Sequence, residues 1–207
     1  MTQAADILRE SFLAPDFAGE LDPAPYLALV PDDEACKGVF FQGVVEAVRR
    51  AAPSRVDAVF EGMTLQRFVP FLDYPLREHM RMTLNAAKIL HPRVPSREAM
   101  RRLGWLAFQS FSSSLVGRVV FGALGRDPER ILAASPRAVS LSLRYGRLQA
   151  NRLGRCHFRL VFSRIYGYLD TYYVGVTEGA LRAFGIMPRI ALRLTSLADG
   201  EMDVLWV

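Results

Sequence analysis

Cysteine and histidine are scarce in this chain of 207 residues, which has two cysteines and three histidines. Cys36 and Cys156 lie far apart, and neither belongs to a Cys-x-x-Cys pair or to a Cys/His cluster with zinc-ligand spacing. We therefore expect no disulfide framework, no metal site and no cofactor. Both thiols should be reduced, as is usual in the cytoplasm.

Long hydrophobic runs are also missing. The longest uncharged stretch, Leu103 to Gly117, has 15 residues and contains Gln109 and several serines, whereas a transmembrane helix needs about 20 predominantly apolar residues. No basic region precedes an apolar stretch near Met1, so a secretory signal is not expected. These absences predict a cytoplasmic protein without a transmembrane segment.

Motifs of common enzyme classes are absent from the sequence. It contains no Gly-x-Ser-x-Gly nucleophile elbow, no P-loop and no His-Glu-x-x-His run. With only three histidines, general acid–base catalysis would fall to carboxylates, and no close carboxylate pair stands out. The sequence therefore predicts a protein that is not an enzyme and has no catalytic residues.

Charge is distributed unevenly along the chain. The formal net charge is +5, and 24 of the 26 basic residues are arginines. Residues 1–36 hold eight acids, one arginine and four prolines, a net charge of −7, whereas residues 37–207 carry +12. We interpret residues 1–36 as an acidic, detachable leader that can lie back on a basic domain formed by residues 37–207.

The densest basic run has two open interpretations. Seven arginines and no acid lie between Arg137 and Arg164. Such a run forms either a polyanion-binding surface or a solvated face of a sheet. Because no nucleic-acid-reading motif accompanies it, we do not expect nucleic acid to be a partner.

Hydrophobic spacing and helix-breaking residues predict the helices. Regular structure should begin near Lys37, with a helix that Pro53 closes. Asp73 is the expected N-cap of a helix that ends near Leu90, and Ser96 begins the next one. The other predicted helices are a short one at 55–62, a buried one at 115–124, one at 127–142 that is bent or interrupted at Pro136, and one at 170–184 capped by Asp170 and Gly185.

Alternation with a period of two predicts the strands. The apolar residues of 155–164 fall on one face, and 147–153 can pair with this segment. Asp199-Gly200 within the alternating segment 189–207 is typical of a hairpin turn. The order of helices, hairpin, helix and hairpin predicts an α+β fold, in which N-terminal helices pack on one face of a four-stranded antiparallel sheet.

Candidate ligand-binding residues lie in three predicted helices, the one that begins at Ser96, the one at 115–124 and the one at 170–184. Aromatic residues and a run of serines lie together at 103–121, and small side chains beside large ones can form a cavity. In the 170–184 helix, Gly175 and Gly179 permit close approach of a neighbouring backbone. The candidates are Trp105, Phe108, Phe111, Ser114, Phe121, Tyr172, Tyr173 and Glu178.

The alternatives for these residues stay open. The apolar side of the 170–184 helix is a pocket wall, a dimer seam or, the favoured interpretation, core packed on the sheet. We expect Glu178 to be exposed. If it were buried it would need a partner, such as an arginine from the sheet, and would mark a polar point in an apolar cavity.

Three blocks of the sequence resemble a known family. They are KGVFFQGVVEAV, REAMRRLGWLAFQSFSSSLVGRVVFGALG, and YYVGVTEGALRAFG followed by a hairpin that ends in LWV. Over about residues 37–207 they are similar to the myxobacterial proteins called domain of unknown function 2378. The element order is also similar to that of four-vinyl-reductase domains, phenol-sensing domains, Bet3-type transport-particle subunits and haem-nitric-oxide-binding domains. This resemblance implies a site for an apolar ligand between helices and sheet, and a homodimer, although fold does not determine function.

Two branches of this superfamily have sites that the sequence lacks. The haem-binding branch is characterised by a histidine ligand and a Tyr-x-Ser-x-Arg run, and no such run occurs here. Of the candidate ligands His79, His91 and His157, we expect the last two to be surface or capping residues. The metal-binding phenol sensors use Cys and His near the final hairpin, where this sequence has neither.

The sequence thus predicts a non-catalytic regulatory or sensor domain that binds an apolar small molecule or acyl chain between helices and sheet. The alternative is a protein-interaction adaptor or scaffold domain with a filled core. The expected partners are an apolar small molecule or lipid, a second copy of the chain in a homodimer, or another protein.

Overall fold

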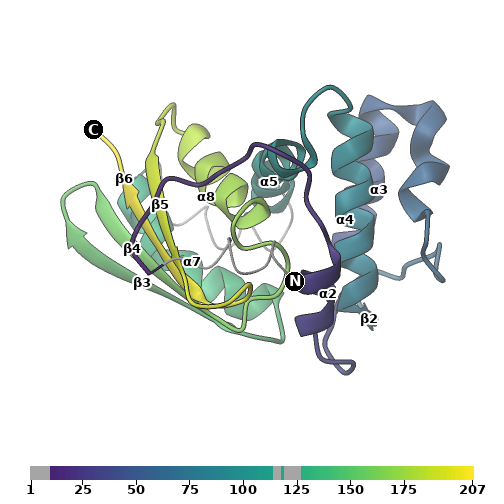
Figure 1. Cartoon of the computed structure of the whole chain (residues 1–207), viewed down its shortest axis with the longest axis horizontal. Coiled ribbons are helices and arrows are strands. Elements are labelled where there is room, and N and C mark those ends of the chain that lie inside the picture. Colours follow the sequence, from purple (N-terminus) through teal and green to yellow (C-terminus); the bar gives the residue numbers. More distant parts are fainter. Residues whose placement is uncertain (1–9, 114–117, 119–126) are drawn as a thin grey trace.

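The computed structural model, shown in Figure 1, describes residues 10–113, residue 118 and residues 127–207. A helical layer, a pair of central helices and a four-stranded sheet lie side by side. This is the α+β arrangement that the sequence predicts. The predicted buried helix at 115–124 falls outside the described residues, except for Arg118.

Short amphipathic helices form the helical layer, because each buries one face against its neighbours. Its helices are α2 (Ala24–Leu29), α3 (Gly38–Ala51), the 3-10 helix η1 (Pro53–Phe60) and α4 (Leu76–Leu90). Phe41 and Val48 on α3 pack with Met80 on α4 in one hydrophobic cluster, and all three are almost fully buried. The predicted helix closed by Pro53 is confirmed, whereas the segment after it is a 3-10 helix.

Asp73 does not cap α4, so that prediction is wrong. It belongs to the short strand β2 (Asp73–Pro75), which pairs antiparallel with β1 (Ala35–Lys37). Its carboxylate forms ion pairs with Lys37 at 2.8 Å and Arg144 at 2.6 Å. These two cations, which are distant in sequence, bind the side chain that an isolated helix would use as a cap.

The two central helices, α5 (Ser96–Ser113) and α8 (Tyr172–Arg182), touch backbone to backbone. A methyl group added to Gly175 would lie 1.9 Å from the carbonyl oxygen of Arg101, and one added to Gly179 would lie 2.9 Å from the backbone of Trp105. The predicted close approach at these two glycines is confirmed. Glycine is required here because any side chain would hold the helices apart.

Two adjacent hairpins form the sheet. Its strands are β3 (Arg147–Gly154), β4 (His157–Ser163), β5 (Arg189–Leu194) and β6 (Gly200–Leu205), in the antiparallel order β3-β4-β6-β5. Phe158, Leu160 and Phe162 of β4 are buried on the inner face, as their alternation predicts. That face packs against α8 and α7 (Pro128–Ser142). The α7 helix continues through Pro136, and Asp127 caps it by accepting a hydrogen bond from the Glu129 amide at 3.0 Å.

Two local turn predictions need correction. Gly200 is not in a two-residue turn but pairs with Leu194, so residues 195–199 form the loop between β5 and β6. Asp170 does not cap α8. The residue at the N-cap position is Thr171, and its side chain forms no capping hydrogen bond. The Asp170 carboxylate is buried and instead binds Arg97 at 2.6 Å.

Residues 10–36 pack on the rest of the chain, so the prediction that regular structure begins near Lys37 is wrong. Leu13 and Leu192 exchange backbone hydrogen bonds of 2.9 and 2.8 Å at the edge of β5. The buried Tyr26 of α2 donates its hydroxyl to Asp170 at 2.9 Å. The division into a leader and a domain at residues 36 and 37 stays a prediction.

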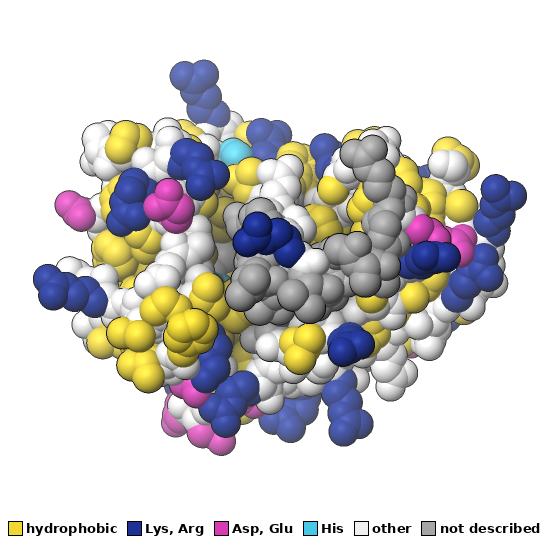
Figure 2. All heavy atoms as spheres, turned by 180° about the vertical axis from the view of Figure 1, so that it is seen from behind, with side chains coloured by type: hydrophobic (Ala, Val, Ile, Leu, Met, Phe, Trp, Pro, Cys, Tyr) yellow, Lys and Arg dark blue, Asp and Glu magenta, His cyan; other side chains and the backbone are white. Residues whose placement is uncertain are grey.

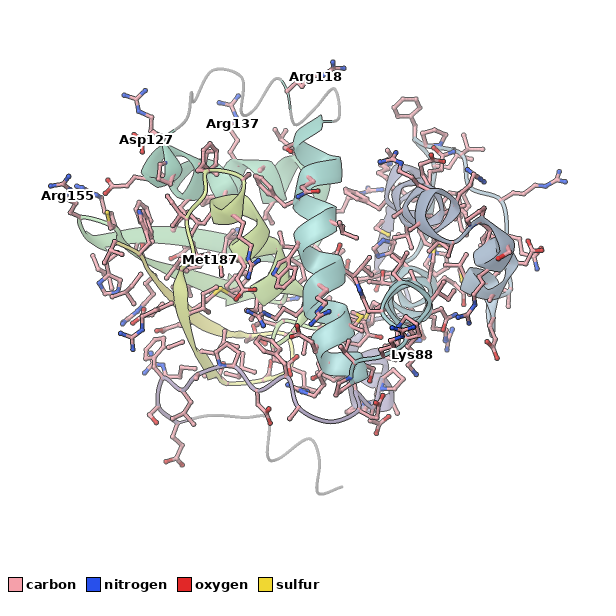
Figure 3. The ribbon with its side chains drawn as sticks, turned by 90° about the horizontal axis from the view of Figure 1, so that it is seen from above. Lys88, Arg118, Asp127, Arg137, Arg155 and Met187 are labelled. Carbon is pink, nitrogen blue, oxygen red and sulfur yellow. The ribbon has the colours of Figure 1, made fainter. Side chains whose placement is uncertain are left out.

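The basic run between Arg137 and Arg164 is largely neutralised by acids from other parts of the chain. The ion pairs are Arg144–Asp73, Arg152–Glu129, Arg159–Asp203 and Arg164–Glu34. Figure 2 shows basic side chains dispersed over one face rather than gathered in one patch. Arg137 and Arg155 project from separate places, one from α7 and the other from the turn between β3 and β4 (Figure 3). This arrangement favours a solvated surface over a polyanion site.

None of the helices among the described residues is long and apolar enough to cross a membrane.

Candidate functional site

Four side chains that carry hydroxyl or thiol groups come together between the helical layer and the sheet. We call this cluster the tyrosine junction; it consists of Cys36, Tyr145, Tyr172 and Tyr173. The Tyr145 hydroxyl donates to the carbonyl of Tyr166 at 3.5 Å and lies near the Tyr173 side chain. The rings of Tyr172 and Tyr173 lie 5.7 Å apart at 90°.

The tyrosine junction lies between two separate hydrophobic clusters. Tyr172 packs against the cluster of the helical layer, and Tyr173 packs against the cluster of the sheet. Consecutive residues of a helix point about 100° apart, so the first turn of α8 can direct one ring to each side. Viewed from above, the central helix α5 stands between these two parts of the molecule (Figure 3).

Burial keeps the tyrosine junction uncharged. It raises the pKa of the Cys36 thiol to about 12, and the negative charge of Asp73 adds to this effect. Burial also raises the pKa of Tyr145, Tyr172 and Tyr173 above the usual range of tyrosine. At neutral pH the groups are therefore neutral hydrogen-bonding groups rather than a nucleophile or a base.

Glu178 is buried and fully paired, so the prediction that it is exposed is wrong. Its carboxylate accepts two hydrogen bonds from Arg101, at 2.7 and 2.8 Å, and one from the indole N–H of Trp105, at 2.7 Å. Both partners come from α5 rather than from the sheet. The guanidinium of Arg182 lies 4.0 Å from the centre of the Trp105 ring, in a cation–π contact. These groups satisfy the carboxylate, so Glu178 joins two helices.

The predicted site residues do not form one group. Tyr173 and Glu178 lie five positions apart on α8, which places them about 140° apart around the helix. Phe108 is buried in α5. The side chain of Phe111 and all of Ser114 and Phe121 fall outside what the structure describes.

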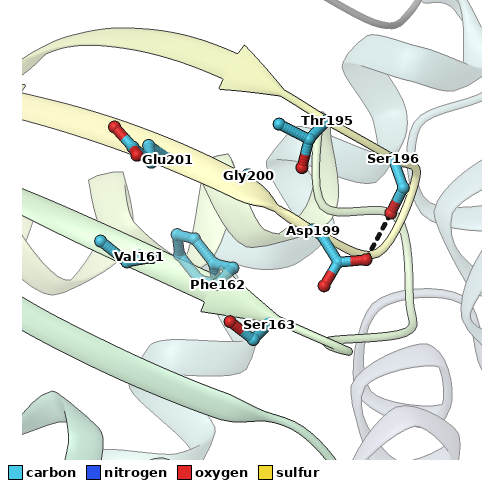
Figure 4. A pocket seen from close by; sticks show the side chains of 8 residues that line it. All are labelled: Val161, Phe162, Ser163, Thr195, Ser196, Asp199, Gly200 and Glu201. Atoms are coloured by element: carbon cyan, nitrogen blue, oxygen red, sulfur yellow. Dashed lines mark hydrogen bonds between the residues drawn. The ribbon is translucent and has the colours of Figure 1, made fainter.

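A polar hollow lies elsewhere, at one end of the sheet. It has a volume of about 360 Å³ and opens widely to solvent. Figure 4 shows hydroxyl and carboxylate groups around it, among them Ser196, which donates a hydrogen bond to Asp199 at 2.6 Å. Its lining residues are Val161, Phe162, Ser163, Thr195, Ser196, Asp199, Gly200 and Glu201. None of them belongs to the predicted ligand-binding set.

Sequence reasoning missed Tyr145 and Cys36. Tyr145 follows the end of a predicted helix, and Cys36 lies in the segment interpreted as a leader. Both are buried, at 5% and 3% exposure. The one available signal was that an apolar, isolated cysteine is commonly buried. Its proximity to tyrosines more than 100 positions away in sequence is a tertiary property.

The arrangement of helices and sheet is similar to that of solved H-NOX proteins. Over 83% of this chain and 99% of the other, it matches an H-NOX protein from S. oneidensis in the Fe(II)NO ligation state, with a TM-score of 0.66 and 15% identity. Similar values relate it to the unliganded Fe(II) H-NOX protein from K. algicida, with a TM-score of 0.64, 12% identity, and 83% and 96% coverage. An oxygen-binding H-NOX domain related to soluble guanylate cyclases gives 0.61, 16% identity, and 82% and 94% coverage.

Residues 29–207 match the family described as protein of unknown function DUF2378, and the chain belongs to that family. This confirms the resemblance noted in the sequence. No curated protein matches the chain.

Proposed function

We propose that the protein is a non-catalytic sensor or regulatory domain that binds an apolar small molecule or acyl chain between its helices and its sheet. The observation that carries this proposal is the tyrosine junction, where neutral hydroxyl groups lie between two hydrophobic clusters. A binding site for such a ligand is typically apolar, with a few convergent polar groups that fix its orientation. A carbonyl or hydroxyl group of the ligand would meet the hydroxyls of Tyr172 and Tyr173.

Haem, which is named for one of the similar solved structures, does not fit the residues present. An axial ligand would have to be one of three histidines. His79 packs within the helical layer, its ring 5.0 Å from that of Phe41. His91 ends α4, and His157 lies at the start of β4, 3.8 Å from Asp203. None of them lies on α5, α7 or α8, so we propose a ligand other than haem.

An adaptor domain with a filled core is the second candidate function. The backbone contact between α5 and α8 supports it, because nothing fits between the helices at Gly104, Gly175 and Gly179. The two candidates differ in whether the junction itself holds a ligand. In both, a homodimer stays a prediction.

Native mass spectrometry of the freshly purified full chain tests the proposal, since it reports bound ligand and oligomeric state together. We expect a mass above that of the polypeptide, and an apolar compound in an organic extract of the same sample. A polypeptide mass alone with an empty extract would contradict the sensor function and favour the adaptor.

Haem binding is tested separately by adding hemin to the purified protein. We expect no Soret band characteristic of histidine-ligated haem. A stable Soret band that is lost in His79→Ala would show that the haem argument is wrong.

A further inference from the structure

A surface loop between η1 and β2 displays apolar side chains to water. Phe71 is 83% exposed, Leu72 56% and Val69 52%, and the neighbouring Val39 at the start of α3 is 46% exposed. We call these four residues the apolar loop patch. In the view of Figure 2, hydrophobic side chains gather on part of the surface of the helical layer. Single exposed apolar residues are common, but a contiguous group of this kind marks an interaction site.

Backbone hydrogen bonds and a close contact with α3 hold the loop in this exposed form. The amides of Gly38 and Val39 donate to the carbonyls of Leu72 and Pro70, at 2.9 and 3.0 Å. A methyl group on Gly38 would lie 2.1 Å from the carbonyl oxygen of Val69, so glycine lets the loop sit against α3. These contacts fix the backbone while the apolar side chains stay in water. The exposure is therefore a property of the fold rather than of a loose loop.

A second set of contacts anchors the loop from beneath. The ring of Phe68 stacks on that of Phe41 at 4.1 Å. The Val69 amide donates to the Tyr74 hydroxyl at 2.8 Å, and the side-chain amide of Gln42 donates to the carbonyl of Phe68 at 2.8 Å. Phe68 thus points into the core while the residues that follow it point outward.

The charges around the apolar loop patch are mainly basic. Lys37 donates to the Phe71 carbonyl at 3.1 Å, and Arg67 is exposed in the same loop. Arg144 and Lys37 share Asp73 as an ion-pair partner. Counting Glu61 of the same loop with Asp73, three cations against two carboxylates leave a net charge of +1 around the patch. A basic rim next to an apolar tip is complementary to an anionic lipid surface.

We propose that the apolar loop patch docks this protein on anionic membranes, with Phe71 and Leu72 inserted among the lipids and the neighbouring cations on the headgroups. The patch exposes on the order of 300–400 Å² of apolar surface, about half of the ~800 Å² that one partner contributes to a standard protein interface. This apolar area is too small for a stable protein interface but is sufficient for reversible attachment to a bilayer. This inference is independent of the proposed ligand.

Sedimentation of the full chain with lipid vesicles tests the proposal. One set of vesicles is an equimolar mixture of phosphatidylcholine and phosphatidylglycerol, and the other is phosphatidylcholine alone. We expect binding to the anionic vesicles that weakens in high salt and is much weaker on the neutral ones. Phe71→Ser should reduce the partition constant about 10- to 100-fold, the loss expected when one phenyl group no longer enters an apolar phase.

Met187→Ser is the matched control, because Met187 is 65% exposed and lies on the sheet side of α5, away from the helical layer (Figure 3). It should bind vesicles as the wild type does. Circular dichroism and thermal unfolding verify that both variants are folded. If Phe71→Ser does not fold, Leu72→Ser takes its place.

Several results would overturn the proposal. One is that the wild type does not sediment with anionic vesicles. Another is that Phe71→Ser and Met187→Ser bind these vesicles equally. A third is self-association of the wild type that Phe71→Ser abolishes without any vesicle binding, which would make the patch an interface between copies of the chain.

Discussion

The two sides of α8 contain very different polar groups. On one side Glu178 is charged, buried and satisfied by three hydrogen bonds from α5. On the other side Tyr172 and Tyr173 are neutral and lie between two apolar clusters. A buried charge is stable only when its partners surround it. The ion pair of Glu178 therefore holds α8 against α5. The neutral side holds no charge that must stay paired, and this suits the apolar ligand that we propose. Substitutions on the two sides of α8 should therefore differ in their effects on stability and on binding.

Gly175→Ala should have the largest effect on stability. Its methyl group would lie 1.9 Å from the carbonyl oxygen of Arg101, so the two helix backbones must separate. We expect the free energy of unfolding to fall by about 3–5 kcal/mol, the range of overpacking combined with loss of a buried contact. Urea denaturation followed by circular dichroism measures it.

Gly43→Ala is the control for that variant. Gly43 also lies in a helix, but nothing lies within 4 Å of an added methyl group. This variant should gain about 0.5–1 kcal/mol from helix propensity. Equal effects of the two substitutions would mean that α5 and α8 do not pack as described.

Glu178→Gln tests the charged side directly. The substitution leaves Arg101 beside a neutral amide, and we expect a loss of about 2–4 kcal/mol, with no specific effect on ligand binding. The control is Glu46→Gln, because Glu46 forms an exposed ion pair with Arg49 at 2.8 Å, worth less than about 0.5 kcal/mol. If both variants were equally stable, the contacts of Glu178 with α5 would not stabilise the fold as we expect.

His79 should make the helical layer sensitive to acid. Burial lowers the pKa of its imidazole to about 4, whereas the unfolded chain titrates near 6.5. Between these values the unfolded state binds more protons, so stability is complete above pH ~6.5 and falls as the pH drops toward 4. We expect a loss of roughly 1–3 kcal/mol, measured by urea denaturation at several pH values.

His79→Leu should flatten that part of the pH profile. The ring of His79 lies edge-on to Phe40 and Phe41, so an apolar replacement keeps most of its contacts. An unchanged acid dependence in the variant would assign the effect to other groups.

Tyr173→Phe should have the smallest effect on stability and a clear effect on binding. It removes a neutral hydroxyl beside Tyr145 and Tyr172 while keeping the ring, and we expect a change of less than about 1 kcal/mol in unfolding. The affinity for the fluorescent acyl-chain probe cis-parinaric acid should fall about 5- to 10-fold. If Tyr173→Phe binds the probe as the wild type does, the tyrosine junction does not contact it.

Features that depend on neighbouring residues could be predicted from the sequence. The alternation in β4 placed Phe158, Leu160 and Phe162 on one face, because side chains of a strand alternate. The α5 and α7 helices, the two hairpins and the close approach at Gly175 followed from local spacing in the same way.

Contacts between groups that are distant in sequence could not be predicted in this way. Arg101 and Glu178 are 77 positions apart, and Cys36 reaches Tyr172 from a segment that composition alone marks as a leader. Asp73 and Asp170 left their expected helix caps because cations from elsewhere bind them better. Periodicity reports only the face on which a residue lies, whereas its partner depends on how the faces pack, and that is a property of the whole folded chain.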